Sequence, residues 1–321
     1  MDTSVKAKQL TDKKEYISSN ADTLLLSAGL LAVSFFINGL PALRMAAVCL
    51  ISGAISEYIC FSVILKKKTF NDLGAFASSL LIAMLLPASA PLYIGALASA
   101  FAIWVAKLPF GDGRNTPFLP AAAGFCFIAM LFPAETFGYA SATPLLDMLA
   151  EGNSVKLNLI GFSRLMTGYY SGAIGTAVPG ALAGVFLYRL VRKPKSLLPS
   201  LGFIASSAIF VCLFPRLNCD LFTSLVNEMC AGSILFTALM LINDPVTSPS
   251  KPVRAILYGF MGGIISMLLR YFGNMYDGGV FAVLIMNCLW PAFFGEAVSG
   301  KLKQKKKKTV TVSKNKEGGA K

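Results

Sequence analysis

The chain has 321 residues, of which 55% are hydrophobic and only 14% are charged, and its mean hydropathy is +0.65. So apolar a composition leaves too little polar surface for a soluble globule of this size, and it indicates an integral membrane protein. A formal net charge of +13 would point to nucleic acid in a soluble protein. In a membrane protein such an excess follows from topology, so no nucleic-acid partner is expected.

The predicted elements are all helices. Residues 1–21 are polar and are expected to form a cytoplasmic tail, followed by a first helix that stays as an anchor rather than a cleaved signal peptide. The chain has ten apolar segments, of which this first helix is one, and each approaches the roughly 20 residues that a membrane crossing needs. They are 22–38, 43–65, 73–87, 92–108, 118–133, 168–190, 199–214, 228–243, 254–273 and 278–297.

Two other regions are predicted outside the membrane. Residues 134–167 form the one long loop, between the fifth and sixth segments, and residues 298–321 form a basic cytoplasmic tail. The run Lys305–Lys308 follows the last segment directly, so we expect it to contact anionic membrane lipid.

A spacing of 158 residues divides the chain into two bundles, 22–160 and 161–297. Five apolar segments separate equivalent positions, and an odd number of crossings reverses the direction of the chain. The predicted fold class is therefore all-α, with about ten transmembrane helices in two inverted five-helix repeats. The residues that recur are Gly74, Pro87, Pro91 and Pro133, which match Gly232, Pro245, Pro249 and Pro291.

Basic residues set the predicted orientation, because lysine and arginine accumulate in cytoplasmic loops. With the N-terminus inside, 24 of the 29 lysines and arginines lie in inner segments. Lys107 is counted among them, whereas Arg270 is counted in an outer segment. Both termini are thus expected in the cytoplasm.

The chain has no histidine, and its seven cysteines include no CxxC pair. This excludes haem ligation through histidine and a histidine-based zinc site, and an iron–sulfur cluster held by this chain alone is poorly supported. No metal site is expected, and any redox chemistry needs a bound cofactor.

Two acidic residues are candidates for ion coupling. Glu57 lies deep inside a predicted span, where it can serve an ion or proton path or form an interhelical hydrogen bond. Asp244 ends the eighth span before Pro245, where a structural role at the turn is the alternative. Residues 172–184 are rich in glycine, which indicates either close helix packing or a broken helix that lines a cavity.

Motif residues connect the chain to a known family. The strongest match is Asn-Asp-Pro-Val-Thr-Ser-Pro at 243–249, followed by Gly-Val-Phe-Ala-Val-Leu-Ile-Met-Asn at 279–287. The matches in the first half are Asp72-Leu73-Gly74, Leu86-Pro87, Pro117-Phe118 and Pro120-Ala121. The chain thereby resembles the NqrB/RnfD family of flavin-bearing membrane subunits, and its short loops resemble the RnfD members. The resemblance implies a urea-transporter-like architecture and makes Asp244, Thr247 and Asn287 candidate cofactor-binding residues.

The long loop carries a second family motif. In that family a threonine carries FMN through a phosphoester bond that a flavin transferase makes, and Thr143 is the matching position. Phe137 and Ala140 stand where the motif has an acidic and a hydroxyl residue, and an unmodified Thr-Pro turn is the alternative. The residues that complete the match around the threonine are Ser141, Ala142, Pro144 and Leu145.

The resemblance implies one membrane component of an ion-translocating oxidoreductase of the ferredoxin:NAD type, in a bacterial or archaeal cell membrane. The implied cofactors are covalent FMN on the outer face and a second, non-covalent flavin, for which riboflavin is the candidate. The implied partners are the other subunits of an Rnf-type complex, the flavin transferase, and Na⁺ or H⁺. Two alternatives stay open: a channel or secondary transporter of the same fold with no redox role, and a scaffold that only organises the complex.

Overall fold

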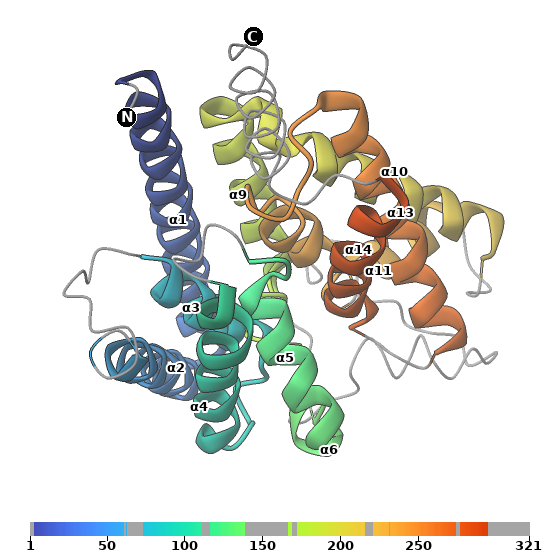
Figure 1. Ribbon diagram of the computed structural model, residues 1–321. Coiled ribbons are helices and arrows are strands. Elements are labelled where there is room, and N and C mark those ends of the chain that lie inside the picture. The colour runs from blue at the N-terminus through green and yellow to red at the C-terminus, as the bar shows by residue number, and fades with distance from the viewer. Residues whose placement is uncertain are drawn as a thin grey trace, which may run out of the picture.

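The computed structural model describes residues 3–60, 62, 73–110, 116–138, 166–168, 172–215, 221–230, 232–273 and 277–294, with side chains from residue 16 onward. Every regular element in these ranges is a helix, as Figure 1 shows, and one isolated β-bridge joins Pro87 to Ala173. The predicted all-α class is confirmed for this part of the chain.

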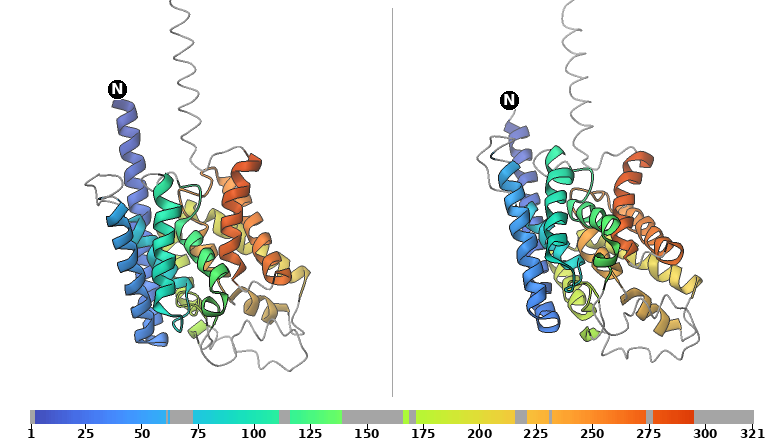
Figure 2. Two further views of the ribbon diagram at one scale, coloured as in Figure 1. Left: turned by 60° about the horizontal axis from the view of Figure 1, so that its bottom comes forward. Right: turned by 90° about the horizontal axis from the view of Figure 1, so that it is seen from below.

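The first half begins with α1 (Thr3–Asn38), which leads away from the N-terminus, and α2 (Leu40–Ile59), which returns beside it (Figure 2). Gly39 reverses the chain between them at a φ of 62°, a conformation that glycine adopts readily, and Pro41 fits the first turn of α2. The remaining elements of this half are α3 (Gly74–Leu85), α4 (Leu92–Phe101), its π-helical continuation η2 (Ala102–Lys107), the short turn η3 (Leu108–Phe110), α5 (Pro120–Leu131) and α6 (Pro133–Thr136).

The second half contains α9 (Pro179–Arg192), η4 (Pro194–Leu197), α10 (Leu198–Leu213), α11 (Leu221–Cys230), α12 (Ile234–Phe236), its π-helical continuation η5 (Thr237–Leu241), α13 (Pro252–Phe272) and α14 (Gly278–Phe294). Helix α10 begins 158 residues after α2, and α14 begins 158 residues after α5. This is the spacing of the repeat in the sequence. The two halves touch where α14 packs against α5 and where α9 packs against α1.

Five helices in the described ranges are long and apolar enough to cross a membrane. A sixth crossing results if α11 and the α12–η5 helix, which meet at a bend of 67°, form one broken span. Helices α3, α5 and α14 are apolar but shorter. The five long segments are Tyr16–Asn38, Leu40–Ile59, Leu92–Phe110, Pro194–Leu213 and Pro252–Phe272.

Proline explains two of the short helices. Leu86, which precedes Pro87, is extended with a ψ of 148°, and α3 therefore ends at Leu85. Phe132, before Pro133, likewise leaves the helical conformation and ends α5. The sequence therefore predicted both helices at the right place. The predicted segments 73–87 and 118–133 were slightly too long, because each included the proline at which the helix has already ended.

The sixth predicted segment, 168–190, was wrong in its first part. Residues 172–178 are not helical, and α9 begins only at Pro179, which has the fixed φ that suits a first helical turn. The N–H groups of Ile174 and Gly175 instead donate to the carbonyls of Leu86 and Met84, at 3.0 and 2.7 Å. The glycine-rich stretch thus serves close backbone pairing with the end of α3.

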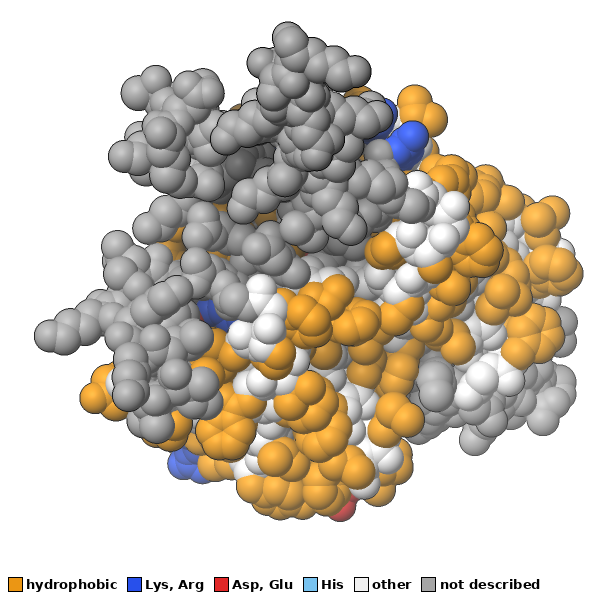
Figure 3. All heavy atoms as spheres, in the orientation of Figure 1, with side chains coloured by type: hydrophobic (Ala, Val, Ile, Leu, Met, Phe, Trp, Pro, Cys, Tyr) orange, Lys and Arg blue, Asp and Glu red, His pale blue; other side chains and the backbone are white. Residues whose placement is uncertain are grey.

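The surface and the core agree with a membrane setting. Hydrophobic side chains cover most of the described face in Figure 3, and they include strongly exposed residues such as Phe36, Val191 and Phe272. Side chains that face lipid need not be polar, whereas a soluble protein rarely exposes so large an apolar surface. Among the largest fully buried side chains is a charged one, Lys107, which borders the cleft described next.

Candidate functional site

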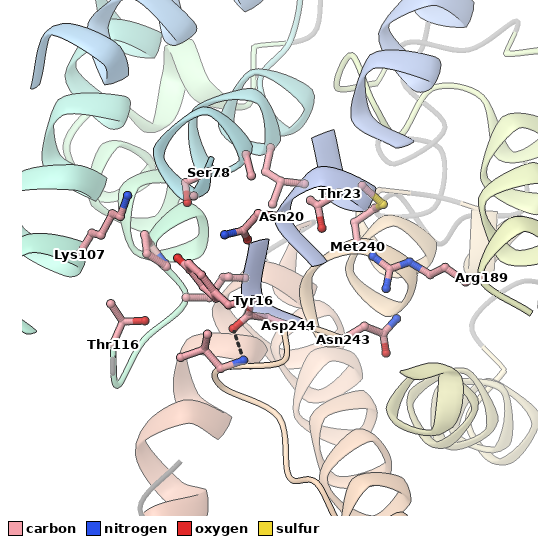
Figure 4. Close-up of a pocket in the computed structure, with 16 residues that line it drawn as sticks. Tyr16, Asn20, Thr23, Ser78, Lys107, Thr116, Arg189, Met240, Asn243 and Asp244 are labelled. Atoms are coloured by element: carbon pink, nitrogen blue, oxygen red, sulfur yellow. Dashed lines mark hydrogen bonds between the residues drawn. The ribbon is translucent and has the colours of Figure 1, made fainter. Parts of the chain in front are cut away.

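A polar cleft of about 30 Å³ lies between α1 and the ends of five other helices, and Figure 4 shows its lining. This volume is enough for a water molecule. The lining combines polar and apolar groups and comprises Tyr16, Asn20, Thr23, Gly74, Ala77, Ser78, Leu81, Lys107, Thr116, Leu119, Pro120, Arg189, Met240, Asn243, Asp244 and Val246. Both halves of the chain therefore build one site.

A buried ion pair stands at one wall of the cleft. The Lys107 Nζ donates to the Glu57 Oε1 at 2.6 Å, and the two side chains are only 2% and 4% exposed. Lys107 ends the π-helix η2, and irregular π-helical turns often accompany functional sites. The sequence counted Lys107 on the cytoplasmic side, at the end of the span 92–108, and that side stays a prediction; the structure adds that the lysine is buried against the acid of α2.

The opposite wall is built by the second π-helix, η5. Its geometry leaves the carbonyls of Ala238 and Leu239 able to accept from the Asn243 Nδ2, both at 3.1 Å. The same amide nitrogen donates to the Ser200 Oγ at 2.6 Å. The Asn243 Oδ1 and the Asn20 Nδ2 are buried without a hydrogen-bond partner among the described residues. An acceptor and a donor are therefore available in the cleft for a water molecule or a small ion.

Asp244 closes the turn that follows η5. Its Oδ2 accepts from the N–H groups of Val246 and Thr247 at 3.2 and 3.0 Å, and the first of these bonds is dashed in Figure 4. Burial raises the pKa of Asp244, whereas the two N–H donors and the charge of Arg189 favour its ionised form. This geometry supplies the structural role that the sequence offered as one of two interpretations. A role in ion coupling stays a prediction.

The predicted residues Thr247 and Asn287 lie on two sides of Tyr258, a residue that sequence reasoning missed. The Tyr258 Oη donates to the Asn287 Oδ1 at 2.7 Å, and Thr247 is close enough to affect the phenol. Tyr258 also packs edge-on against Trp290, with ring centroids 5.5 Å apart. The two motif stretches, 243–249 and 279–287, are therefore brought together by one buried tyrosine of α13.

A second buried ion pair lies outside the cleft. Arg270, in the last turn of α13, has its Nη1 3.5 Å from the Glu228 Oε2 and donates to the Glu228 backbone carbonyl at 2.7 Å. Both side chains are at most 2% exposed. The sequence counted Arg270 at the outer end of the span 254–273; the structure has it in the last turn of α13, buried, and its side of the membrane stays a prediction.

The loop residues Ser141, Ala142, Thr143, Pro144 and Leu145 lie outside the described residues. The start of the loop is described. Phe137 packs against Phe125, with ring centroids 6.2 Å apart, and the Ser89 Oγ donates to the Gly138 carbonyl at 2.8 Å. The chain thus leaves the bundle beside the turn that follows α3. Among the described residues, no group of three or more cysteine, aspartate or glutamate side chains could hold a metal ion.

Comparison with known proteins gives consistent matches. The model of the NQR2, RnfD, RnfE family matches residues 5–296. The chain is 30% identical to the D subunit of the Na(+)-translocating ferredoxin:NAD(+) oxidoreductase complex of Acetobacterium woodii, over 90% of this chain and 92% of the relative. It is 26% identical to the D subunit of the proton-translocating ferredoxin:NAD(+) oxidoreductase complex of Clostridium ljungdahlii, over 79% and 81%. It is 25% identical to the D subunit of the ion-translocating oxidoreductase complex of Halorhodospira halophila, over 84% and 86%.

Proposed function

The chain belongs to the NQR2, RnfD, RnfE family, and from that premise we propose that it is the RnfD-type membrane component of an ion-translocating ferredoxin:NAD oxidoreductase complex. The observation that carries the proposal is the extent of the match, which covers 90% of this chain and 92% of the Acetobacterium relative. A match of that length includes turns as well as apolar helices, so a shared hydropathy pattern does not account for it. The proposed partners are the other subunits of such a complex.

The proposed architecture is ten crossings in two inverted repeats. Its support is that equivalent elements bring opposite ends to the cleft. From α1 the cleft receives residues 16–23 near the start of its apolar segment, whereas from α9 it receives Arg189 near the end. The same holds for α3 and the equivalent α12–η5 helix. The cleft contains residues from the N-terminal end of α3, but residues 240–246 from the C-terminal end of η5 and the turn after it. The short helices α3, α5 and α14 are then proposed to cross only part of the membrane.

A covalent FMN on Thr143 is the proposed redox group. The supporting observations are the Ser-Ala-Thr-Pro-Leu match at 141–145 and the position of α6, which Figure 2 shows at the end of the bundle remote from the N-terminus. Bound FMN would supply one-electron and two-electron transfer. The chain's part is to hold the loop, through the contacts of Phe137 and Gly138 with the bundle.

The second flavin has no comparable support among the residues that the structure describes. The cleft measures about 30 Å³, whereas pockets for cofactor-sized ligands measure about 300 Å³ or more. The Asp244 carboxylate is also committed to two backbone N–H groups. We therefore assign no flavin, riboflavin included, to Asp244, Thr247 and Asn287, and we derive no electron-transfer step from them.

Ion coupling is proposed to involve the Glu57–Lys107 pair. Buried charges inside a membrane are costly and are commonly retained for an ion or proton pathway. The lysine of this pair lines the cleft together with Asn243 and Asp244, so a cation or proton that enters the cleft meets Asp244 directly and Glu57 through Lys107. The names of the relatives differ between Na⁺ and H⁺, and the proposal is accordingly made for either ion.

The first experiment tests the flavin. The chain is produced with its flavin transferase, and a denaturing gel is viewed under ultraviolet light alongside an intact-mass measurement. We expect fluorescence and the added mass of an FMN phosphoester in the wild type and in Ser141→Ala, and neither in Thr143→Ala. A dark band at unmodified mass, while a known substrate of the same transferase is labelled, would contradict flavinylation and favour the channel or scaffold alternatives.

The second experiment tests the ion path in the assembled complex. We expect Glu57→Gln to lower ion translocation more than electron transfer, because glutamine keeps the shape but cannot carry the charge or proton. Glu228→Gln, which alters the other buried pair, is the matched control and is expected to leave the ratio of the two rates unchanged. Equal loss of both rates in Glu57→Gln, or the same ratio in both variants, would remove the assignment.

A further inference from the structure

A basic cavity at the seam between α1 and α9 is not used by the proposed function. It measures about 100 Å³ and lies beside the cleft, from which Arg189 separates it. Its lining comprises Ser19, Asp22, Leu26, Tyr188, Arg189, Arg192, Lys193, Ser196, Asn243 and Pro245. Three cations of this lining, Arg189, Arg192 and Lys193, come from the C-terminal end of α9. They can point into the same cavity because residues three and four apart lie on the same face of a helix.

The acids near the cavity do not neutralise these cations. Asp22 binds the Arg192 Nε at 3.1 Å and the Lys193 Nζ at 2.7 Å, and it also accepts from the Tyr188 hydroxyl at 3.3 Å. Asp244 is the other acid that faces Arg189, and it already accepts two backbone N–H groups. Three cations therefore face two acids. The negative end of the α9 dipole, equivalent to about half a charge, offsets only part of the difference.

Arg189 carries the unsatisfied donor. Its Nε is buried and has no hydrogen-bond partner among the described residues. Figure 4 shows the side chain reaching from α9 towards α1 and Asn243, so the guanidinium lies between the cleft and the basic cavity. A guanidinium with free N–H groups in a fixed plane is well suited to bind the oxygens of a phosphate.

The surroundings of the cavity indicate a lipid rather than a soluble anion. The cations end α9, and the apolar segment of α1 begins at Tyr16, only six residues before Asp22. The cavity is therefore at the membrane boundary. Both helices also carry exposed apolar side chains, namely Leu25 on α1 and Leu187, Leu190 and Val191 on the face of α9 that points away from the cavity. A basic pocket between membrane helices with apolar flanks is typical of a site for an anionic lipid headgroup.

We propose that this cavity binds the headgroup phosphate of an anionic phospholipid, with Arg189 as its central donor and the acyl chains along the apolar faces of α1 and α9. The site is separate from the predicted lipid contact of Lys305–Lys308, and it does not depend on the flavin or on ion coupling. The bound lipid would neutralise the excess charge and hold α9 against α1.

The test measures lipid retained by the purified full-length chain. The protein is exchanged into detergent with phosphatidylglycerol, phosphatidylcholine or inorganic phosphate, and the bound lipid is counted by native mass spectrometry while the melting temperature is recorded. We expect phosphatidylglycerol alone to be retained and to raise the melting temperature. Arg189→Gln is expected to weaken retention about fivefold, the contribution of one basic residue near anionic lipid.

Two further variants separate the site from general effects. Lys251→Gln removes an exposed charge outside the cavity and should retain lipid like the wild type. Arg192→Gln alters a side chain that is 57% exposed, so it should fold even if Arg189→Gln does not, and it should weaken retention by a smaller factor. Equal retention in all variants, equal loss in Lys251→Gln, or protection by inorganic phosphate as strong as by phosphatidylglycerol would each overturn the proposal.

Discussion

The two repeats contain the same pair of prolines, and they close the turn between them in different ways. In the first repeat, Leu86 precedes the turn Pro87–Pro91, and the carbonyls at the end of α3 accept N–H groups from residues 174 and 175, far away in the sequence. In the second repeat, Asp244 occupies the equivalent place before the turn Pro245–Pro249, and its own side chain accepts two N–H groups of that turn. A repeat in sequence thus fixes where the chain reverses, while the partner that satisfies the backbone differs.

The same difference separates the buried ion pairs. Lys107 ends the helix that follows the first turn, and its pair with Glu57 borders the polar cleft. Arg270 lies in the last turn of the equivalent helix α13, and its pair with Glu228 borders neither the polar cleft nor the basic cavity. The first pair therefore has access to water or ions through the cleft, and the second has a structural position.

Removal of one member of each pair should have the largest effect. An unpaired charge that stays buried costs about 3–5 kcal/mol. We expect Arg270→Met to lie at the upper end of this range, because Glu228 is then left without its cation in a closed environment. Lys107→Met should cost less, since Glu57 beside the cleft can be hydrated or take up a proton. The stability of both variants is measured in detergent by heating samples to increasing temperatures and determining the folded fraction by size-exclusion chromatography.

The double variants complete that comparison. Glu57→Gln combined with Lys107→Met should recover much of the stability that Lys107→Met loses, because no charge is left unpaired. Glu228→Gln combined with Arg270→Met should recover less, since the Glu228 carbonyl still lacks its donor. The distinction between the pairs fails if Lys107→Met is as damaging as Arg270→Met.

A substitution at Gly175 tests whether residues 172–178 hold the first turn in place. A Cβ at this position would lie 2.6 Å from the Met84 Cβ and 2.9 Å from the Phe236 Cε2. Gly175→Val should therefore push residues 172–178 away from α3 and lower stability by about 2–3 kcal/mol. Gly184→Ala is the control, because nothing lies within 4 Å of its Cβ and alanine favours the helix. Equal melting temperatures of Gly175→Val and wild type would show that the distant segment does not hold the turn.

How much of this could be foreseen from the sequence depends on whether a feature is local. Proline and glycine positions explain where α2 begins and where α3 and α5 end, because their backbone preferences act within a few residues, although the predicted segments ran through Pro87 and Pro133. Residues 172–178 could not be predicted in the same way, since their pairing with Met84 and Leu86 requires the two segments to meet. The burial of Lys107 was missed for a similar reason: counting charges by loop ignores an acid that lies on a neighbouring helix.

The candidate site shows the same division. The candidates Asp244, Thr247 and Asn287 came from the family resemblance; in the structure Asp244 binds the N–H of Thr247, and Asn287 accepts from Tyr258. Tyr258 itself carries no sequence signal, because a tyrosine inside an apolar helix is unremarkable until its hydroxyl partner is known. The position of Thr143 falls outside the described residues, so its role is decided by the gel and mass experiment.

The local closure of the second turn gives the smallest expected effect and the most specific one. Asp244→Leu gives the second repeat the residue that the first repeat has at the equivalent position, Leu86. The N–H groups of Val246 and Thr247 then lose their acceptor. The loss should be about 1–2 kcal/mol, as for other residues that cap backbone N–H groups. Asp244→Asn keeps an oxygen in place and should lose only a fraction of that. If Asp244→Asn instead unfolds as readily as Asp244→Leu, the carboxylate acts through its charge on Arg189 rather than through the turn. If ion translocation is unchanged in both variants, the coupling role can no longer be assigned to Asp244, and Glu57, which pairs with the cleft residue Lys107, is the candidate that is left.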